Sequence, residues 1–159
     1  MKAIPTEYKG ISFRSKLEAS YAKTLDELEI RWVYEHNGYD IGGVRYLPDF
    51  WLPEIRTFLE VKGPVIPGAE KAKDLAVVLN PEVEAWWFPN FLVVIGNEMG
   101  ELRLAEDDSH VSLAVCERCK RYWFMPDTGS YACRNCGIHD GDHHIMKTFD
   151  KLALSQLQV

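Results

Sequence analysis

Residues 46–63 read Tyr-Leu-Pro-Asp-Phe-Trp-Leu-Pro-Glu-Ile-Arg-Thr-Phe-Leu-Glu-Val-Lys-Gly. Asp49 follows a proline, and Glu60-Val61-Lys62 comes eleven residues later. Side chains of a strand alternate between the two faces of a sheet, so Glu60 and Lys62 are predicted to point the same way. The surrounding residues are apolar, and a charged group in such a place is costly unless it is paired or bound to a cation.

The segments around this stretch predict the elements of one α/β core. Strands are expected over 45–52 and 57–62, joined as an antiparallel pair, with a further strand over 30–35 before them. Ser15 and Glu18 fit a capping box, so a helix is expected to begin there. Its apolar stripe is formed by Leu17, Tyr21, Leu25 and Leu28.

After residue 63 the pattern predicts a helix over 69–79, a buried strand over 91–95 and its hairpin partner over 101–105. Together these elements indicate an α/β core with a mixed sheet. The acidic break at 106–109 is the predicted domain boundary, which makes residues 1–109 the first domain.

Composition and charge limit the classes of function. The chain has 159 residues, of which 47% are hydrophobic, and this composition is typical of a globular protein. Neither a bilayer-spanning apolar run nor a signal peptide is recognisable, so we expect a cytoplasmic protein without membrane contact. The net charge of −6 argues against a simple polyanion binder, but residues 1–24 are locally basic.

The charged residues themselves suggest a chemistry. Two carboxylates on one face, Asp49 and Glu60, can hold Mg²⁺, which prefers oxygen ligands. The nearby Lys62 can orient a water or stabilise a charged transition state, as phosphodiester hydrolysis requires. The alternative is structural: Glu18 as a capping residue, Asp49 as a turn residue, and Glu60 with Lys62 as a surface ion pair.

The pattern resembles the PD-(D/E)xK nuclease superfamily and, within it, the phage endonuclease I type of Holliday-junction resolvase. The resemblance covers roughly residues 10–65. The residues that carry it are Phe13-Arg14-Ser15, Leu17-Glu18, Ile30 through Glu35, Tyr46, Pro48-Asp49-Phe50, Leu52-Pro53, Glu60 and Lys62-Gly63.

The resemblance implies a restriction-endonuclease-like core, in which a central mixed sheet is flanked by helices. It implies DNA cleavage that depends on Mg²⁺ or Mn²⁺, with Asp49 and Glu60 as metal ligands. Glu18 would complete the acidic cluster, and Lys62 would position the attacking water. Arg14 and Lys16, on either side of Glu18, are the predicted phosphate contacts.

The same resemblance makes branched DNA the first expected substrate and a phage or mobile element the expected source, with the host cytoplasm as location. It leaves a homodimer open. A phage recombination or packaging complex is the expected protein partner.

Four cysteines predict a second module over residues 110–150, followed by a tail over 151–159. They form two Cys-x-x-Cys pairs, and four thiolates close a tetrahedral Zn²⁺ site without an open position, so the module resembles a structural zinc ribbon. The four cysteines are Cys116, Cys119, Cys133 and Cys136. In a competing interpretation a histidine, from His139, His143 or His144, replaces one cysteine.

Basic residues around the two Cys-x-x-Cys turns, here called the knuckles, suit binding of nucleic acid. The ribbon could equally dock on the nuclease or on a partner protein. These residues are Arg118, Lys120, Arg121 and Arg134. Two further functions therefore stay open beside the nuclease. One is a non-catalytic nucleic-acid or protein-binding module, and the other is an accessory nuclease subunit of a larger complex.

Overall fold

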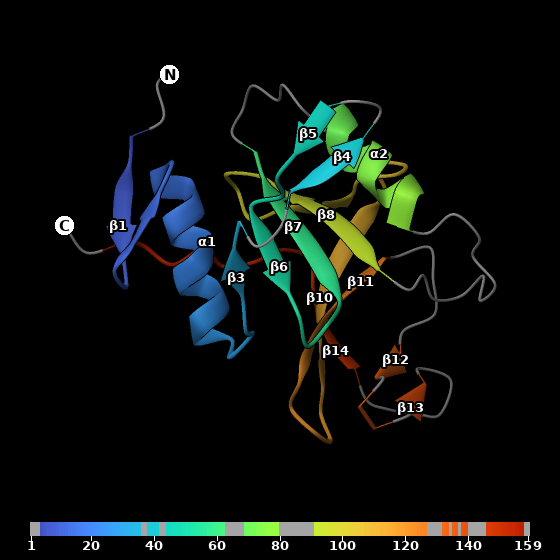
Figure 1. The fold of residues 1–159 in the computed structure, drawn as a ribbon. Helices are drawn as coiled ribbons and strands as arrows, with labels where there is room; N and C mark the ends of the chain where they lie inside the picture. Colours follow the sequence, from blue (N-terminus) through green and yellow to red (C-terminus); the bar gives the residue numbers. More distant parts are fainter. Residues whose placement is uncertain are drawn as a thin grey trace.

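The protein is described from a computed structural model, which covers residues 4–35, 38–41, 44–62, 69–79, 91–126, 132–133, 135–136, 138–139 and 146–157. Its centre is a mixed sheet whose described strands run in the order β11-β10-β9-β8-β7-β6-β3, with β14 also paired to β10 (Figure 1). The strands are β3 (Val33–Tyr34), β6 (Phe50–Leu52), β7 (Thr57–Val61), β8 (Leu92–Gly96), β9 (Leu102–Leu104), β10 (His110–Cys116), β11 (Tyr122–Pro126) and β14 (Met146–Phe149). The predicted α/β class with a mixed sheet is confirmed.

Within the described residues, three pairs of short strands accompany the sheet. Each pair is antiparallel. They are β1 (Thr6–Tyr8) with β2 (Ile11–Phe13), β4 (Tyr39–Ile41) with β5 (Val44–Tyr46), and β12 (Ala132–Cys133) with β13 (Ile138–His139).

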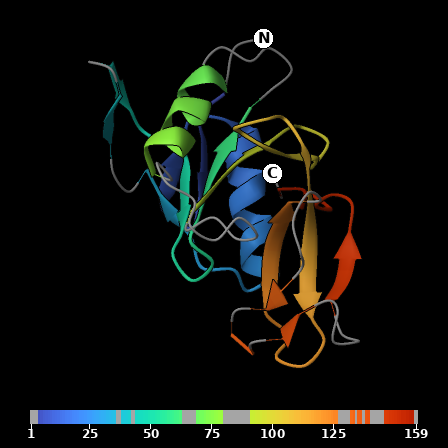
Figure 2. The same ribbon diagram turned by 90° about the vertical axis from the view of Figure 1, so that its right-hand side faces the viewer.

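Strand β7 lies between β6 and β8 in the sheet and is buried on both faces. It pairs antiparallel with β6 and parallel with β8, and all five of its residues are buried. Leu59 belongs to the core cluster that contains the buried face of helix α1 (Lys16–Glu27), whereas Phe58 belongs to the cluster that contains helix α2 (Ala69–Leu79). Because neighbouring strand residues face opposite ways, the two helices cover opposite faces of the sheet (Figure 2).

Helix α1 begins as the sequence predicts, because Ser15 is its N-cap and accepts a hydrogen bond from the Glu18 backbone N–H at 3.1 Å. The expected apolar stripe is buried at Tyr21 and Leu25. Helix α2 has the predicted bounds, and it buries Ala72, Leu75 and Ala76.

Two of the expected strands differ from the prediction. The expected strand over 45–52 is two strands, β5 and β6, because Pro48 lies between them and proline cannot donate to a ladder. The expected strand over 30–35 is regular only at Val33–Tyr34, where it pairs with Trp51 and Phe50. The break at residues 47–49 is what places Asp49 beside the end of β7.

The sheet also continues across the predicted boundary at residue 109. Strand β9 pairs antiparallel with β8 on one side and with β10 on the other. One core cluster runs from Phe13 in the first segment to Trp123 and Cys133 in the second. The strands of the cysteine module are therefore joined to the main sheet by both hydrogen bonds and a shared core.

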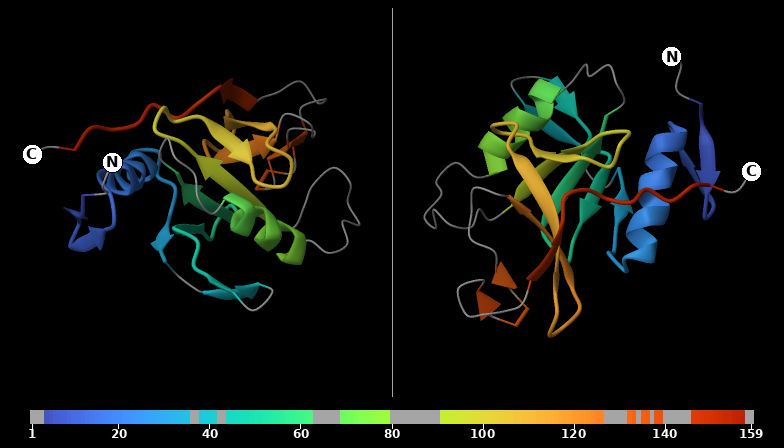
Figure 3. Two further views of the ribbon diagram at one scale, coloured as in Figure 1. Left: turned by 90° about the horizontal axis from the view of Figure 1, so that it is seen from above. Right: turned by 180° about the vertical axis from the view of Figure 1, so that it is seen from behind.

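The predicted C-terminal tail packs against the rest of the protein over residues 151–157. The Leu152 N–H donates to the Gly100 carbonyl at 2.8 Å, and the Ser155 N–H donates to Thr24 Oγ1 at 2.9 Å. Gly100 has φ +79°, and a Cβ there would lie 2.1 Å from the Leu152 carbonyl oxygen, so the position requires glycine. The segment thereby connects β14 to α1 along the back of the sheet (Figure 3, right).

Candidate functional site

The acidic residues expected from the sequence meet near the C-terminal end of β7. Asp49 directly precedes β6, Glu60 lies in β7, and Glu18 lies in the first turn of α1. All three are buried, with exposed fractions of 6%, 5% and 7%. Buried carboxylates of this kind are unfavourable unless partners or a cation compensate them.

Glu60 is held at both carboxylate oxygens. Its Oε2 accepts hydrogen bonds from the Tyr46 hydroxyl at 2.6 Å and from the Asp49 backbone N–H at 3.2 Å. Its Oε1 faces the Lys62 ammonium at 2.8 Å. The predicted pair of Glu60 and Lys62 therefore exists, but with Glu60 buried and Lys62 half-buried it is not a surface ion pair.

Asp49 is the least compensated of the three acids. Its Oδ2 accepts the Val61 N–H at 2.8 Å. Burial raises the pKa of Asp49 to about 8, and the negative charges of Glu60 and Glu18 add to the rise, while the Val61 N–H and Lys62 only partly offset it. The site thus concentrates more negative charge than its neighbours neutralise, and a divalent cation bound by oxygen ligands would relieve this repulsion.

Glu18 joins this group from the helix side. Tyr34 donates its hydroxyl to Glu18 Oε1 at 2.6 Å, and Ser15 Oγ is 3.0 Å from Oε2. Burial and then the neighbouring Glu18 raise the pKa of Tyr34, so the phenol keeps its proton and donates it. Of the capping-box hydrogen bonds, the Glu18 N–H donates to Ser15 Oγ. The Glu18 carboxylate instead accepts from the hydroxyls of Tyr34 and Ser15.

Arg14 and Lys16 lie beside Glu18, at the start of α1, with exposed side chains. Arg14 pairs with Glu35, and its Nε is 2.7 Å from Glu35 Oε1. Its backbone N–H also donates to the Tyr34 hydroxyl at 3.3 Å. Both predicted phosphate contacts are thus next to the acidic cluster.

Two tyrosine hydroxyls contact the acids of the site without having been predicted from the sequence pattern. Tyr34 and Tyr46 each place a phenol 2.6 Å from a carboxylate of the cluster. The sequence did place each tyrosine in a predicted strand close to an acidic residue. Sequence alone gave no register that would have paired the tyrosine with the carboxylate.

Removal of the Tyr46 hydroxyl provides a test of this network. Tyr46→Phe leaves Glu60 Oε2 with the Asp49 N–H alone, so we expect the free energy of unfolding to fall by about 1–3 kcal/mol. Urea unfolding measures the change. Tyr122→Phe on β11 removes a hydroxyl outside the cluster and serves as control. An equal loss in both variants would contradict the role of Tyr46.

The second cluster consists of the four cysteines. Their Sγ atoms all lie within 4.8 Å of one another, with 3.8 Å between Cys116 and Cys136 and 3.6 Å between Cys119 and Cys133. The Cys136 N–H also points to the Cys133 Sγ at 3.4 Å. Four thiolates at this spacing suit a closed tetrahedral Zn²⁺ site, so the cluster is compatible with structural zinc.

The thiols differ in acidity. Burial and the neighbouring thiols raise the pKa of Cys136 to about 12, and burial also raises the pKa of Cys133. At Cys119 burial acts in the same direction, but hydrogen bonds led by the Arg121 backbone outweigh it and lower the pKa to about 6. One thiolate is therefore readily formed, and a metal would deprotonate the others on binding.

The chain matches no protein-family model, no curated protein and no solved structure. Function is therefore inferred from the geometry of the two clusters. None of the helices in the described ranges is long and apolar enough to cross a membrane.

Of the basic residues predicted around the two Cys-x-x-Cys turns, Lys120 lies far from the carboxylates. Lys120 lines a groove together with Glu27, which is the last residue of α1, whereas Glu18 is in the first turn of this 12-residue helix. The helix alone separates the two places by about 14 Å. Arg118 is exposed and Arg121 half-buried on the same turn, while Arg134, His143, His144 and the side chain of His139 lie outside the described residues.

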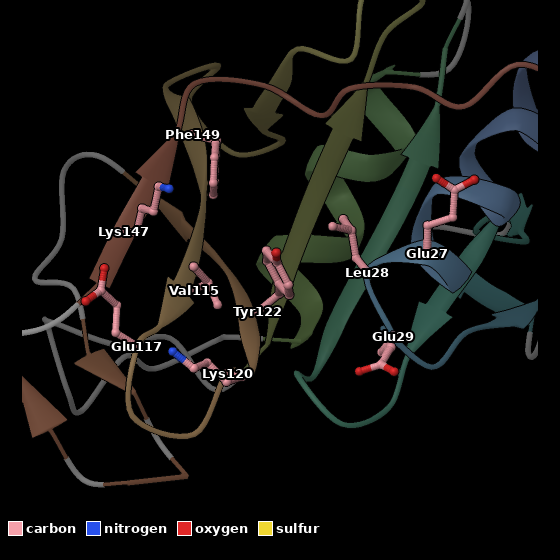
Figure 4. Close-up of a pocket in the computed structure, with 9 residues that line it drawn as sticks. All are labelled: Glu27, Leu28, Glu29, Val115, Glu117, Lys120, Tyr122, Lys147 and Phe149. Atoms are coloured by element: carbon pink, nitrogen blue, oxygen red, sulfur yellow. The ribbon is translucent and has the colours of Figure 1, made fainter.

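The groove beside the knuckle has a volume of about 590 Å³ and mixed charge (Figure 4). Tyr122 and Phe149 present rings from β11 and β14, and Lys120 and Lys147 lie near them. Three glutamates also line the groove: Glu27, Glu29 and Glu117. This balance of charge gives the groove no preference for a polyanion.

Proposed function

We propose that the protein is a Mg²⁺-dependent DNA endonuclease with a restriction-endonuclease-like core and a structural zinc module. One observation carries the proposal: Asp49 and Glu60 are buried beside the half-buried Lys62 at the end of strand β7, and Glu18 lies close enough to raise the pKa of Asp49. Acids in a merely structural role would be expected to be fully compensated by their partners.

The residues divide the work as follows. Asp49 and Glu60 would hold Mg²⁺ or Mn²⁺, with Glu18 completing the acidic cluster directly or through water. The bound cation would neutralise the phosphate and activate a water. Lys62 would position that water and stabilise the charge that develops on the phosphate. Arg14 and Lys16 would hold the DNA backbone next to the cluster.

A second candidate is an accessory nuclease subunit whose partner supplies affinity for DNA. The net charge of −6 and the distance between Lys120 and the carboxylates favour this alternative. In that case DNA would be held mainly by a partner of a recombination or packaging complex, and the same acidic cluster would still cut.

A panel of substrates separates these functions. The purified protein is incubated with Mg²⁺ and a four-way junction, a linear duplex, a nicked duplex, a single strand or an RNA duplex. Cleavage of the junction alone supports a structure-selective resolvase, and cleavage of every DNA supports a general nuclease. No cleavage by a folded, zinc-loaded protein, restored by a partner, supports the accessory subunit. No cleavage under any condition contradicts the nuclease.

A further inference from the structure

The position of Lys62 has a consequence for how the acidic cluster changes on metal binding. Its ammonium lies 2.8 Å from Glu60 Oε1, and the two side chains are only 17% and 6% exposed. Glu60 Oε2 is already occupied by the Tyr46 hydroxyl and the Asp49 N–H. Oε1 is therefore the oxygen of Glu60 that a metal ion could bind. In the metal-free protein the Lys62 ammonium already contacts this oxygen.

An ammonium and a divalent cation cannot share this oxygen at low cost. Both are positive, and like charges a few ångströms apart in a buried site repel strongly because the surrounding medium screens them weakly. Asp49 directly precedes β6 and Glu60 lies in the adjacent β7, and both are fixed by Val61, Tyr46 and the backbone. Lys62 follows the last residue of β7 and carries a flexible four-carbon side chain, so the lysine is the group that can move.

We infer that Lys62 holds the place of the metal in the metal-free protein, and that binding of a divalent cation to Asp49 and Glu60 releases it from Glu60. The inference rests on the metal site proposed above and adds a switch to it. The ammonium compensates Glu60 while the metal is absent. Once displaced from Glu60, the ammonium can contact the attacking water and the phosphate. Lys62 can therefore act in cleavage only when the metal is bound.

Accessibility of the amine reports this release directly. The full-length, zinc-loaded protein is treated with an amine-acylating reagent at fixed pH, with rising Mg²⁺ or Ca²⁺ and no DNA, and modification of each lysine is followed by mass spectrometry. A shielded, ion-paired lysine should react slowly. We expect the modification rate of Lys62 to rise at least about fivefold on release. Lys73, exposed on α2, is the internal control and should not change.

Metal affinity gives a second measurement by calorimetric titration. Lys62→Met removes the competing cation and keeps a similar side-chain length, so its affinity for Mg²⁺ should rise at least about fivefold, whereas Lys73→Met should bind as the wild type does. A weaker affinity of Lys62→Met would overturn the inference.

The outcomes separate the switch from the proposed function. Metal binding with an unchanged or lower reactivity of Lys62 overturns the switch and leaves the metal site standing. Metal binding by Lys62→Met but not by the wild type overturns the switch, because the metal then fails to displace Lys62. Absence of metal binding by both proteins overturns the switch and the proposed nuclease site together.

Discussion

Asp49→Asn is expected to lower Mg²⁺-dependent cleavage by at least about 10³-fold and, at the same time, to stabilise the metal-free protein at alkaline pH. The loss of cleavage follows because the amide removes a charged metal ligand from the cluster. The gain in stability follows because the same charge is buried beside Glu60 and Glu18 without full compensation. Opposite effects on activity and stability are the signature of an acid that is kept for function.

The pH dependence has a definite sign. The folded-state pKa of Asp49, about 8, lies above the ordinary value of 3.8. Stability from this group is therefore complete below about pH 4 and is lost as the pH rises to about 8, because the unfolded chain releases its proton first. At about pH 8 to 9 we expect Asp49→Asn to be more stable than the wild type by about 1–3 kcal/mol.

Urea unfolding of zinc-loaded protein without Mg²⁺, at several pH values, measures the stability difference. Asp74→Asn is the matched control, since it removes an exposed carboxylate on α2 and should change neither stability nor cleavage. Full cleavage by Asp49→Asn would contradict the assignment of this residue. A stability difference that does not grow with pH would contradict the burial of an uncompensated charge.

Loss of zinc is expected to have the second large effect, a decrease of more than about 3 kcal/mol in the free energy of unfolding. Cys116 is the last residue of β10, is fully buried, and donates its backbone N–H to the Arg121 carbonyl. Cys133 belongs to the same core cluster. The metal would therefore tie β12 and β13 to the main sheet, and its removal should loosen the sheet itself and not only a peripheral module.

Cys116→Ser and treatment with a zinc chelator test this expectation. Elemental analysis should find one zinc per wild-type chain, and substituted Co²⁺ should show the absorption of tetrahedral thiolate coordination. Asp49→Asn should keep its zinc, which shows that the two clusters bind metal independently. Zinc-free protein with unchanged stability would contradict a structural role.

The elements that the sequence predicted well are those fixed by local interactions. The start of α1 follows from Ser15 and its hydrogen bond to the Glu18 N–H, and the bounds of α2 follow from its apolar spacing. The division of 45–52 into two strands follows from Pro48, which cannot donate a hydrogen bond to a strand ladder. Continuity of the sheet past residue 109 depends on the pairing of β9 with β8 and β10, which is set by packing between distant segments and was not predictable from one sequence.

The site divides in the same way. Proximity of Glu60 and Lys62 followed from strand alternation, and the burial of Asp49 and Glu60 from the apolar residues around them. The tyrosine partners were missed because they depend on the register of β5 and β3 against the site. The distance between Lys120 and the carboxylates depends on which end of α1 meets the knuckle, which only the tertiary structure defines.

We propose that the buried carboxylate cluster is a metal-dependent nuclease centre. Its most direct test is single-turnover cleavage of a labelled four-way junction with Mg²⁺ by the wild type, Glu60→Gln and Glu54→Gln, the last removing an exposed carboxylate from the turn after β6. We predict cleavage that requires the metal, is unchanged in Glu54→Gln and falls at least about 10³-fold in Glu60→Gln. Cleavage by folded Glu60→Gln at the wild-type rate would contradict a nuclease centre at this cluster.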